Sequence, residues 1–140
     1  MSSSPNGERK PRVSERYVLD ASAVLCLIRA EPGAEVVKAA LPESTISAVN
    51  LAEVIAKMVD LGMDETLISE VLDPLNLRAI PFDSVQARDS GMLRRVTRAH
   101  GLSLGDRACL AFAAQSGATA LTTDRAWGSL VGVAKVAFAR

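Results

Sequence analysis

Residues 16–30 read "RYVLDASAVLCLIRA", and this stretch decides the fold class. Its first five residues are rich in β-forming side chains and end at an acid, Asp20. The next ten contain neither glycine nor proline and are apolar on nearly every side, which predicts a buried helix over residues 21–30. A strand that passes directly into a buried helix is typical of an α/β protein.

The same alternation of short strands and helices continues along the chain, without the turn sequences of hairpins. It predicts one α/β domain over residues 16–140, in which a mainly parallel central sheet is flanked by helices. We expect further strands at residues 44–47, 77–82, 119–124 and 133–139, and further helices at residues 34–41, 48–62, 64–73, 83–99 and 105–117.

Composition narrows the class of protein. The chain has 140 residues, 49% of them hydrophobic, which suits one folded domain with its own core. No apolar run is long enough to span a membrane, and the polar segment 1–15 lacks the apolar stretch of a secretory signal. Cys26 and Cys109 lie in apolar surroundings, which indicates buried thiols in a reducing compartment. We therefore expect a cytoplasmic protein with a mobile tail over residues 1–15 and no membrane partner.

Charge is balanced overall but not along the chain. Sixteen basic and sixteen acidic side chains give a net charge of zero, which excludes a uniformly basic nucleic-acid coat. Residues 88–107 nevertheless hold five arginines, the only histidine and two aspartates. Arg94, Arg95 and Arg98 in this segment could bind the phosphates of a nucleic acid, or they could form a solvated helix face.

Two acids stand at the ends of predicted strands. Asp20 ends the first strand and Asp124 the fourth. In an open α/β sheet the strands deliver their last residues to one edge, where ligands bind. Each aspartate also precedes a helix-like stretch, so each taken alone could be a simple helix N-cap.

Two further acids lie on predicted helices. Asp106 stands at the start of an apolar helix, where it could act as an N-cap or bind a metal. Glu53 lies inside a helix, on a face with Asn50, Lys57 and Asp60, which taken alone indicates a solvated stripe. Carboxylates gathered at one sheet edge repel one another unless a cation neutralises them, and a site made of oxygen ligands suits Mg²⁺ or Mn²⁺. The spacing of Glu53 and Asp106 alone does not place them at that edge.

Four segments, taken together, resemble those of PIN-domain ribonucleases, in particular the VapC-type toxins of toxin–antitoxin pairs. Their order and spacing fit over nearly all of residues 16–140. The segments are "VLDASAVL" with Asp20 and Ser22, "SAVNLAEV" with Glu53, "LSLGDRACLA" with Asp106, and "LTTDRAW" with Asp124 after Thr122.

The resemblance implies a PIN-like sheet with strand order 3-2-1-4-5. It implies a catalytic site of four converging acids that hold Mg²⁺ or Mn²⁺, with Asp20 and Asp106 as metal ligands beside Glu53 and Asp124. Such a site would cleave RNA phosphodiesters with a metal-activated water, so the expected activity is that of a metal-dependent endoribonuclease. Ser22 is placed to hydrogen-bond Asp20 or the scissile phosphate.

The resemblance also implies partners. A toxin of this kind is held silent by a cognate antitoxin and forms a homodimer. We expect the antitoxin along an apolar groove near residues 48–72.

Two other functions fit the sequence less well. The first is a non-catalytic interaction module on a PIN-like fold, which four intact acids disfavour. The second is an aspartyl-phosphate phosphatase with Asp20 as nucleophile, a class that usually carries a second aspartate two residues later, where this chain has Ser22.

Overall fold

The computed structural model describes residues 16–130 and 132–140, so the expected tail over residues 1–15 lies outside the described residues. The strands are β1 (Tyr17–Leu19), β2 (Ser44–Ser47), β3 (Ala79–Ile80), β4 (Thr119–Thr122) and β5 (Lys135–Phe138). The helices are α1 (Ala21–Ile28), α2 (Ala34–Ala40), α3 (Ala48–Asp60), α4 (Glu65–Leu72), α5 (Ser84–Met92), α6 (Arg94–Thr97) and α7 (Leu104–Ser116). Short 3-10 turns are η1 (Leu41–Glu43), η2 (Asp73–Leu75), η3 (Arg98–His100) and η4 (Arg125–Ser129).

The five strands form one sheet in the order β3-β2-β1-β4-β5, and every pair of neighbours is parallel. Both the predicted α/β class and the strand order 3-2-1-4-5 are confirmed. In the register of the sheet, Leu19 of β1 lies opposite Ile46 of β2 and Leu121 of β4. The carboxyl ends of these three central strands therefore lie level with one another.

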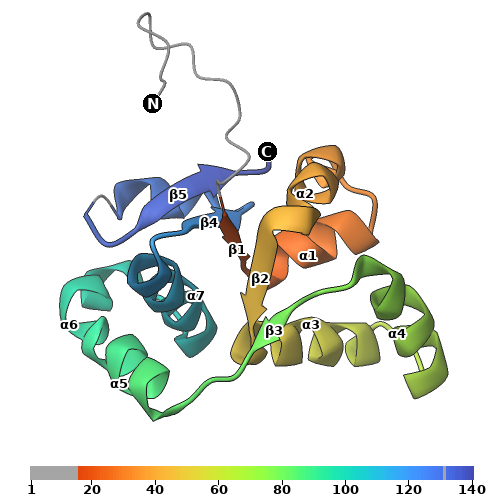
Figure 1. The fold of residues 1–140 in the computed structure, drawn as a ribbon, viewed down its shortest axis with the longest axis horizontal. Helices are drawn as coiled ribbons and strands as arrows, with labels where there is room; N and C mark the ends of the chain where they lie inside the picture. Colours follow the sequence, from red (N-terminus) through yellow and green to blue (C-terminus); the bar gives the residue numbers. More distant parts are fainter. Residues whose placement is uncertain (1–15, 131) are drawn as a thin grey trace, which may run out of the picture.

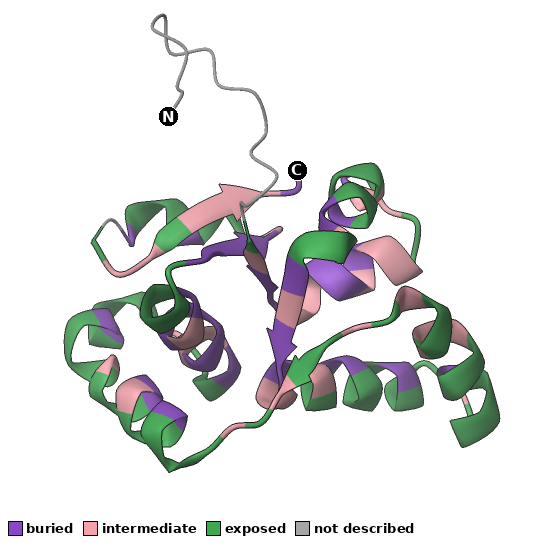
Figure 2. Ribbon diagram, in the orientation of Figure 1, coloured by how far each residue is buried: buried purple, intermediate pink, exposed green. Residues whose placement is uncertain are grey.

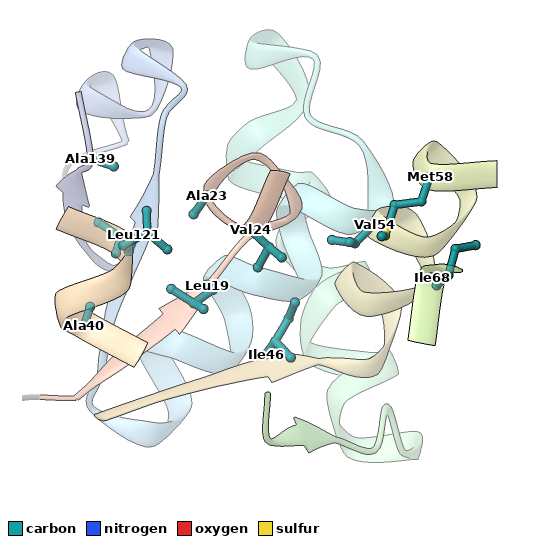
Figure 3. Close-up of a cluster of buried hydrophobic side chains, with 11 residues drawn as sticks. Leu19, Ala23, Val24, Ala40, Ile46, Val54, Met58, Ile68, Leu121 and Ala139 are labelled. Carbon is teal, nitrogen blue, oxygen red and sulfur yellow. The ribbon is translucent and has the colours of Figure 1, made fainter. Parts of the chain in front are cut away.

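Helices cover both faces of the sheet, with α1 to α4 on one side and α5 to α7 on the other (Figure 1). Because successive strand residues point to opposite faces, Leu19 packs into the core under α1 to α4, and Val18 packs against α7. Figure 3 shows Leu19, Val24 and Ile46 meeting between β1, β2 and α1. Strands β1, β2 and β4 and helix α7 hold much of the buried surface, whereas α4 and α5 are mostly exposed (Figure 2).

The segment predicted as one helix over residues 83–99 is divided, and that prediction was wrong. Helix α5 ends at Met92, α6 follows after Leu93, and η3 completes the segment. Gly91 weakens the helix before the break, because glycine is a poor helix former. Beyond the break, the buried hydroxyl of Thr97 donates 2.8 Å to the Leu93 carbonyl, a contact that bends helices.

The other predicted elements are present: β2 has the predicted bounds, α7 is shifted by one residue, and the remaining elements are shorter than predicted. The third strand reduces to Ala79–Ile80, the two residues that pair with β2. None of the described helices combines the length and apolar character required to cross a bilayer.

Candidate active site at the carboxyl ends of the strands

Asp20 is a buried acid at the junction of β1 and α1, with only 4% of its surface exposed. Its Oδ1 accepts a 2.8 Å hydrogen bond from the backbone N–H of Ala23, so it is the N-cap of α1, as one of its two interpretations predicts. The Ser22 hydroxyl donates 2.7 Å to the same oxygen, and the Thr122 hydroxyl donates 2.6 Å to Oδ2. Three donors therefore fix this carboxylate in one orientation.

The register of the sheet brings Thr122 to Asp20. Leu19 pairs with Leu121, so the next residue of each strand, Asp20 and Thr122, lie side by side. Thr122 Oγ1 also accepts 3.0 Å from the backbone N–H of Asp124, and Ser22 Oγ accepts 3.0 Å from that of Thr123. The two hydroxyls thus connect the end of β1 to the turn after β4.

Burial raises the pKa of Asp20 from 3.8 to about 6. The hydrogen bonds from Thr122, Ser22 and Ala23 oppose this rise, because they favour the ionised form. The charge of Asp106 adds to it, which shows that the two carboxylates are close enough to repel each other. Asp20 is therefore an acid whose negative charge is stabilised by dipoles but by no neighbouring cation in the described part of the chain.

Asp106 lies in the first turn of α7, but it is not the N-cap that one interpretation of the sequence favours. That cap is Ser103, whose hydroxyl accepts 3.1 Å from the Asp106 N–H. Asp106 Oδ2 accepts 3.1 Å in return from the Ser103 N–H, which completes a capping box. Oδ1 accepts no hydrogen bond from a described residue, so half of this carboxylate remains available to a ligand.

Glu53 extends from α3 to the first turn of α7. Its Oε1 accepts 2.9 Å from the side-chain amide of Asn50, which also donates 3.0 Å to the carbonyl of Gly105. The Glu53 carboxylate lies so close to Gly105 that a Cβ on this glycine would overlap it. Asn50 is only 1% exposed, so its assignment to a solvated stripe was wrong.

The charges of three acids act on the thiol of Cys109, a fully buried residue of α7. Burial raises the pKa of this thiol well above its ordinary value, and the charges of Asp20, Asp106 and Glu53 raise it further. The carboxylates of these acids therefore share one region. Within residues 16–130 and 132–140, however, no three His, Cys, Asp or Glu side chains are arranged to hold a metal ion as they stand.

Asp124 lies apart from these contacts. It is exposed, and its Oδ1 accepts 3.0 Å from the Ala126 N–H as the N-cap of η4. Its charge is absent from the influences on the pKa of Asp20 and of Cys109. Three of the four predicted acids, Asp20, Glu53 and Asp106, thus influence one shared region of the protein. The fourth, Asp124, lies on the surface after β4.

The three arginines predicted to bind phosphates are exposed and lie between Glu53 and Asp106 in the chain. Arg94 and Arg95 belong to α6 and Arg98 to η3, and among the described residues none of the three forms an ion pair. Arg107, next to Asp106, instead donates 2.9 Å to the Ser90 carbonyl and ties α7 to α5. Arg125 lies over the ring of Phe138, 4.7 Å from its centroid.

Sequence reasoning missed three residues that hold the acids: Asn50, Gly105 and Thr122. Each had a local signal. Asn50 is one helical turn before Glu53, Gly105 directly precedes Asp106, and Thr122 ends a buried strand two residues before Asp124. The contacts of Asn50 with Gly105 and of Thr122 with Asp20 cross from one element to another, and such contacts are not visible in local sequence patterns.

The donor set fits a hard divalent cation. Carboxylate and hydroxyl oxygens are what Mg²⁺ and Mn²⁺ prefer. The region of Asp20, Glu53 and Asp106 presents no imidazole, and burial keeps the nearby Cys109 thiol protonated, so soft metals are disfavoured. These three carboxylates form no ion pair with a described residue. A bound cation would supply the missing positive charge.

The fold is similar to that of several solved structures, a toxin-antitoxin complex among them. DNA-bound VapBC from Salmonella typhimurium aligns over 90% of this chain and 99% of its own, with 17% identity and a TM-score of 0.72. A toxin-antitoxin complex from Klebsiella pneumoniae aligns over 89% and 98%, with 18% identity and a TM-score of 0.69. FitAcB from Neisseria gonorrhoeae aligns over 86% and 95%, with 26% identity and a TM-score of 0.64.

A sequence comparison with curated proteins finds no match. A family model, in contrast, covers most of the chain. The model of the PIN domain matches residues 17–132, which include all four predicted acids. The chain therefore belongs to the PIN-domain family.

Proposed function

We propose that this PIN-domain protein is a metal-dependent endoribonuclease that acts as the toxin of a toxin–antitoxin pair. One observation carries the proposal: Asp20 is buried and repelled by Asp106, yet no described cationic side chain pairs with either acid. Such an arrangement is costly for a merely structural site, because buried charges in proteins are usually paired or bind metals. Perturbed acids of this kind concentrate at functional sites.

In this proposal the chain supplies ligands in fixed positions. Asp20 and Asp106 hold Mg²⁺ or Mn²⁺, and Glu53 and Asp124 complete the catalytic set. A bound cation of this kind activates water and stabilises the charge that develops on the phosphodiester. The hydroxyls of Ser22 and Thr122 keep Asp20 oriented, as their bonds of 2.7 and 2.6 Å indicate. The family resemblance adds that the products carry 5′-phosphate and 3′-hydroxyl ends.

We assign RNA binding to the basic segment that precedes Asp106 in the chain. Arg94, Arg95 and Arg98 are exposed and unpaired among the described residues, so they are free to contact phosphates. Ser22 is the fourth predicted contact with substrate. Its hydroxyl already donates to Asp20, and it would reach the scissile phosphate only by exchanging that bond.

An antitoxin is the proposed partner, as in the toxin–antitoxin complexes that share this fold. Helices α3 and α4 expose four large apolar side chains that the core leaves uncovered, namely Ile55, Val59, Leu61 and Leu67. Exposed apolar surface of this kind marks contact sites for proteins. We place the antitoxin there, on a cytoplasmic toxin that forms a homodimer.

The experiment that tests this function uses the purified full chain and a defined RNA. With Mg²⁺ or Mn²⁺, wild-type protein should cleave the RNA and leave 5′-phosphate and 3′-hydroxyl ends, and excess chelator should stop the reaction. Asp106→Asn should remove the activity, whereas Asp83→Asn should retain it, because Asp83 only caps α5.

Cleavage that persists in chelator would contradict the metal-dependent mechanism. Release of phosphate from a small phosphomonoester, without RNA cleavage, would favour the phosphatase alternative. A well-folded chain that binds its partner but neither binds metal nor cleaves RNA would favour the non-catalytic module.

A further inference from the structure

The amide of Asn50 connects two helices and one acid of the candidate site. It lies in the first turn of α3, is 1% exposed, and uses its nitrogen twice. One bond of 2.9 Å goes to Glu53 Oε1 on the same helix, and one of 3.0 Å goes to the Gly105 carbonyl on α7. The nitrogen has two hydrogens, so both of its donors are used.

The orientation of this amide is determined by its surroundings. Both neighbours of Asn50 Nδ2 are acceptors, so turning the amide would set its oxygen against a carboxylate and a carbonyl. In the observed orientation the Oδ1 atom is buried and has no hydrogen-bond partner among the described residues. An unpaired buried oxygen lowers stability, and the two bonds of the nitrogen must offset that loss.

Gly105 forms the other half of this contact. It is buried in the first turn of α7, and the Glu53 carboxylate occupies the space where a Cβ would stand. Glu53 itself is exposed, and its contacts with Asn50 and Gly105 hold the end of its flexible side chain against α7. The neighbouring residue, Asp106, is a proposed metal ligand.

We propose that Asn50 is a positioning residue, which together with Gly105 holds the Glu53 carboxylate against the first turn of α7, beside Asp106. This inference rests on the metal site proposed above and adds Glu53 to its ligands. The oxygen Oε1 is engaged by Asn50, and Oε2 accepts no hydrogen bond from a described residue. Asn50 therefore orders Glu53 without using the whole carboxylate.

The test is a double-mutant cycle on Mn²⁺ affinity, measured by titration calorimetry with the full chain. Asn50→Ala should weaken Mn²⁺ binding about 10- to 100-fold, the usual effect of losing a partner that orients a ligand. In a Glu53→Gln background the same change should have less than about a twofold effect, because it acts only through that carboxylate. An equal loss in both backgrounds, or no loss in the wild-type background, would overturn the proposal.

A second variant reaches the same carboxylate from the other helix. Gly105→Ala leaves Asn50 in place but must push the Glu53 carboxylate aside, so it should weaken Mn²⁺ binding in the wild-type background and not in Glu53→Gln. If Asn50→Ala does not fold, Gly105→Ala tests the proposal in its place. Unchanged Mn²⁺ affinity in Gly105→Ala would then overturn the proposal.

Gln86→Ala is the matched control, because Gln86 is also a buried amide with an unpartnered oxygen but lies on α5. It should lower the melting temperature and leave Mn²⁺ affinity unchanged, and an equal loss of affinity in this control would overturn a role specific to Asn50. Wild-type protein that binds no Mn²⁺ would instead contradict the metal site itself, and the role of Asn50 with it.

Discussion

Two neighbouring strands of the sheet lead to an aspartate, and the two aspartates have different surroundings. Asp20 follows β1 directly, is buried, and accepts hydrogen bonds from two hydroxyls and one N–H. Asp124 comes two residues after the end of β4, is exposed, and accepts one hydrogen bond, from Ala126. Both cap the start of a helical segment, so capping does not distinguish them.

The difference arises from register. Asp20 lies level with Thr122, and the chain between Thr122 and Asp124 has already left the sheet. In the register of the sheet Asp124 lies two residues beyond Asp20, and this offset decides whether an acid is buried among the other carboxylates or remains at the rim. We infer that the two acids contribute unequally to the proposed site.

The largest expected effect is on RNA cleavage. Asp20→Asn keeps the shape of the side chain but removes its charge, so cleavage at saturating Mn²⁺ should fall about 100-fold or more, at least the loss expected for an outer-shell partner. Asp124→Asn should reduce it by no more than about 10-fold. Single-turnover rates on one RNA measure both. Equal losses of cleavage rate in the two variants would contradict the unequal contributions of Asp20 and Asp124.

The next effect concerns stability and pH in the metal-free protein. The pKa of Asp20 is raised in the folded state from 3.8 to about 6, so folding favours its protonated form. This contribution to stability is fully present below the lower pKa and is lost as the pH rises through about 6. A rise of about two pKa units corresponds to roughly 3 kcal/mol.

Denaturant unfolding in chelator measures this effect. The free energy of unfolding of wild type, relative to that of Asp20→Asn, should decrease by roughly 3 kcal/mol between about pH 3 and pH 7. Asp124→Asn provides the control at the other strand end and should follow the wild-type profile. A constant difference between wild type and Asp20→Asn across this range would show that Asp20 is not strained by its burial.

The smallest expected effect concerns the arginines, which are remote from both strand ends in the sequence. If Arg94, Arg95 and Arg98 contact RNA phosphates, replacing all three by alanine should reduce the slope of log K against log salt by about 2, from about 0.7 per contact on a single strand. Titrations of a labelled RNA at several salt concentrations, with a catalytically inactive variant as parent, measure that slope. An unchanged slope would indicate a solvated helix face.

The arrangement of the sheet was predictable because its signals are local. The run of residues 16–30 contains a strand, an acid and a buried helix in immediate succession, and the chain repeats this pattern. The exact strand order came from the family resemblance and is confirmed. The continuous helix predicted over residues 83–99 was wrong, since α5 ends at Met92, directly after Gly91, a poor helix former.

The acids of the candidate site could be predicted from the sequence, but the residues that orient these acids could not. Position at a strand end predicts both Asp20 and Asp124 as site residues. Only the register of β1 and β4 shows that Asp124 lies further from the sheet. Asn50 was interpreted as a surface residue because its neighbours at helical spacing are charged, whereas its amide in fact turns toward Gly105, 55 residues away in the chain. Contacts of this length depend on how α3 packs against α7, which a pattern along one helix does not reveal.

The central claim is that Asp20 and Asp106 hold a divalent metal, and thermal melts with chelator and with Mn²⁺ test it most directly. At a Mn²⁺ concentration of 100 times the dissociation constant, wild type should gain about 2.7 kcal/mol, or roughly 5–10 °C in melting temperature. Asp83→Asn, a helix-cap control, should gain as much, and Asp20→Asn and Asp106→Asn should gain far less. An equal shift in all four proteins, or none in any of them, would contradict the metal site.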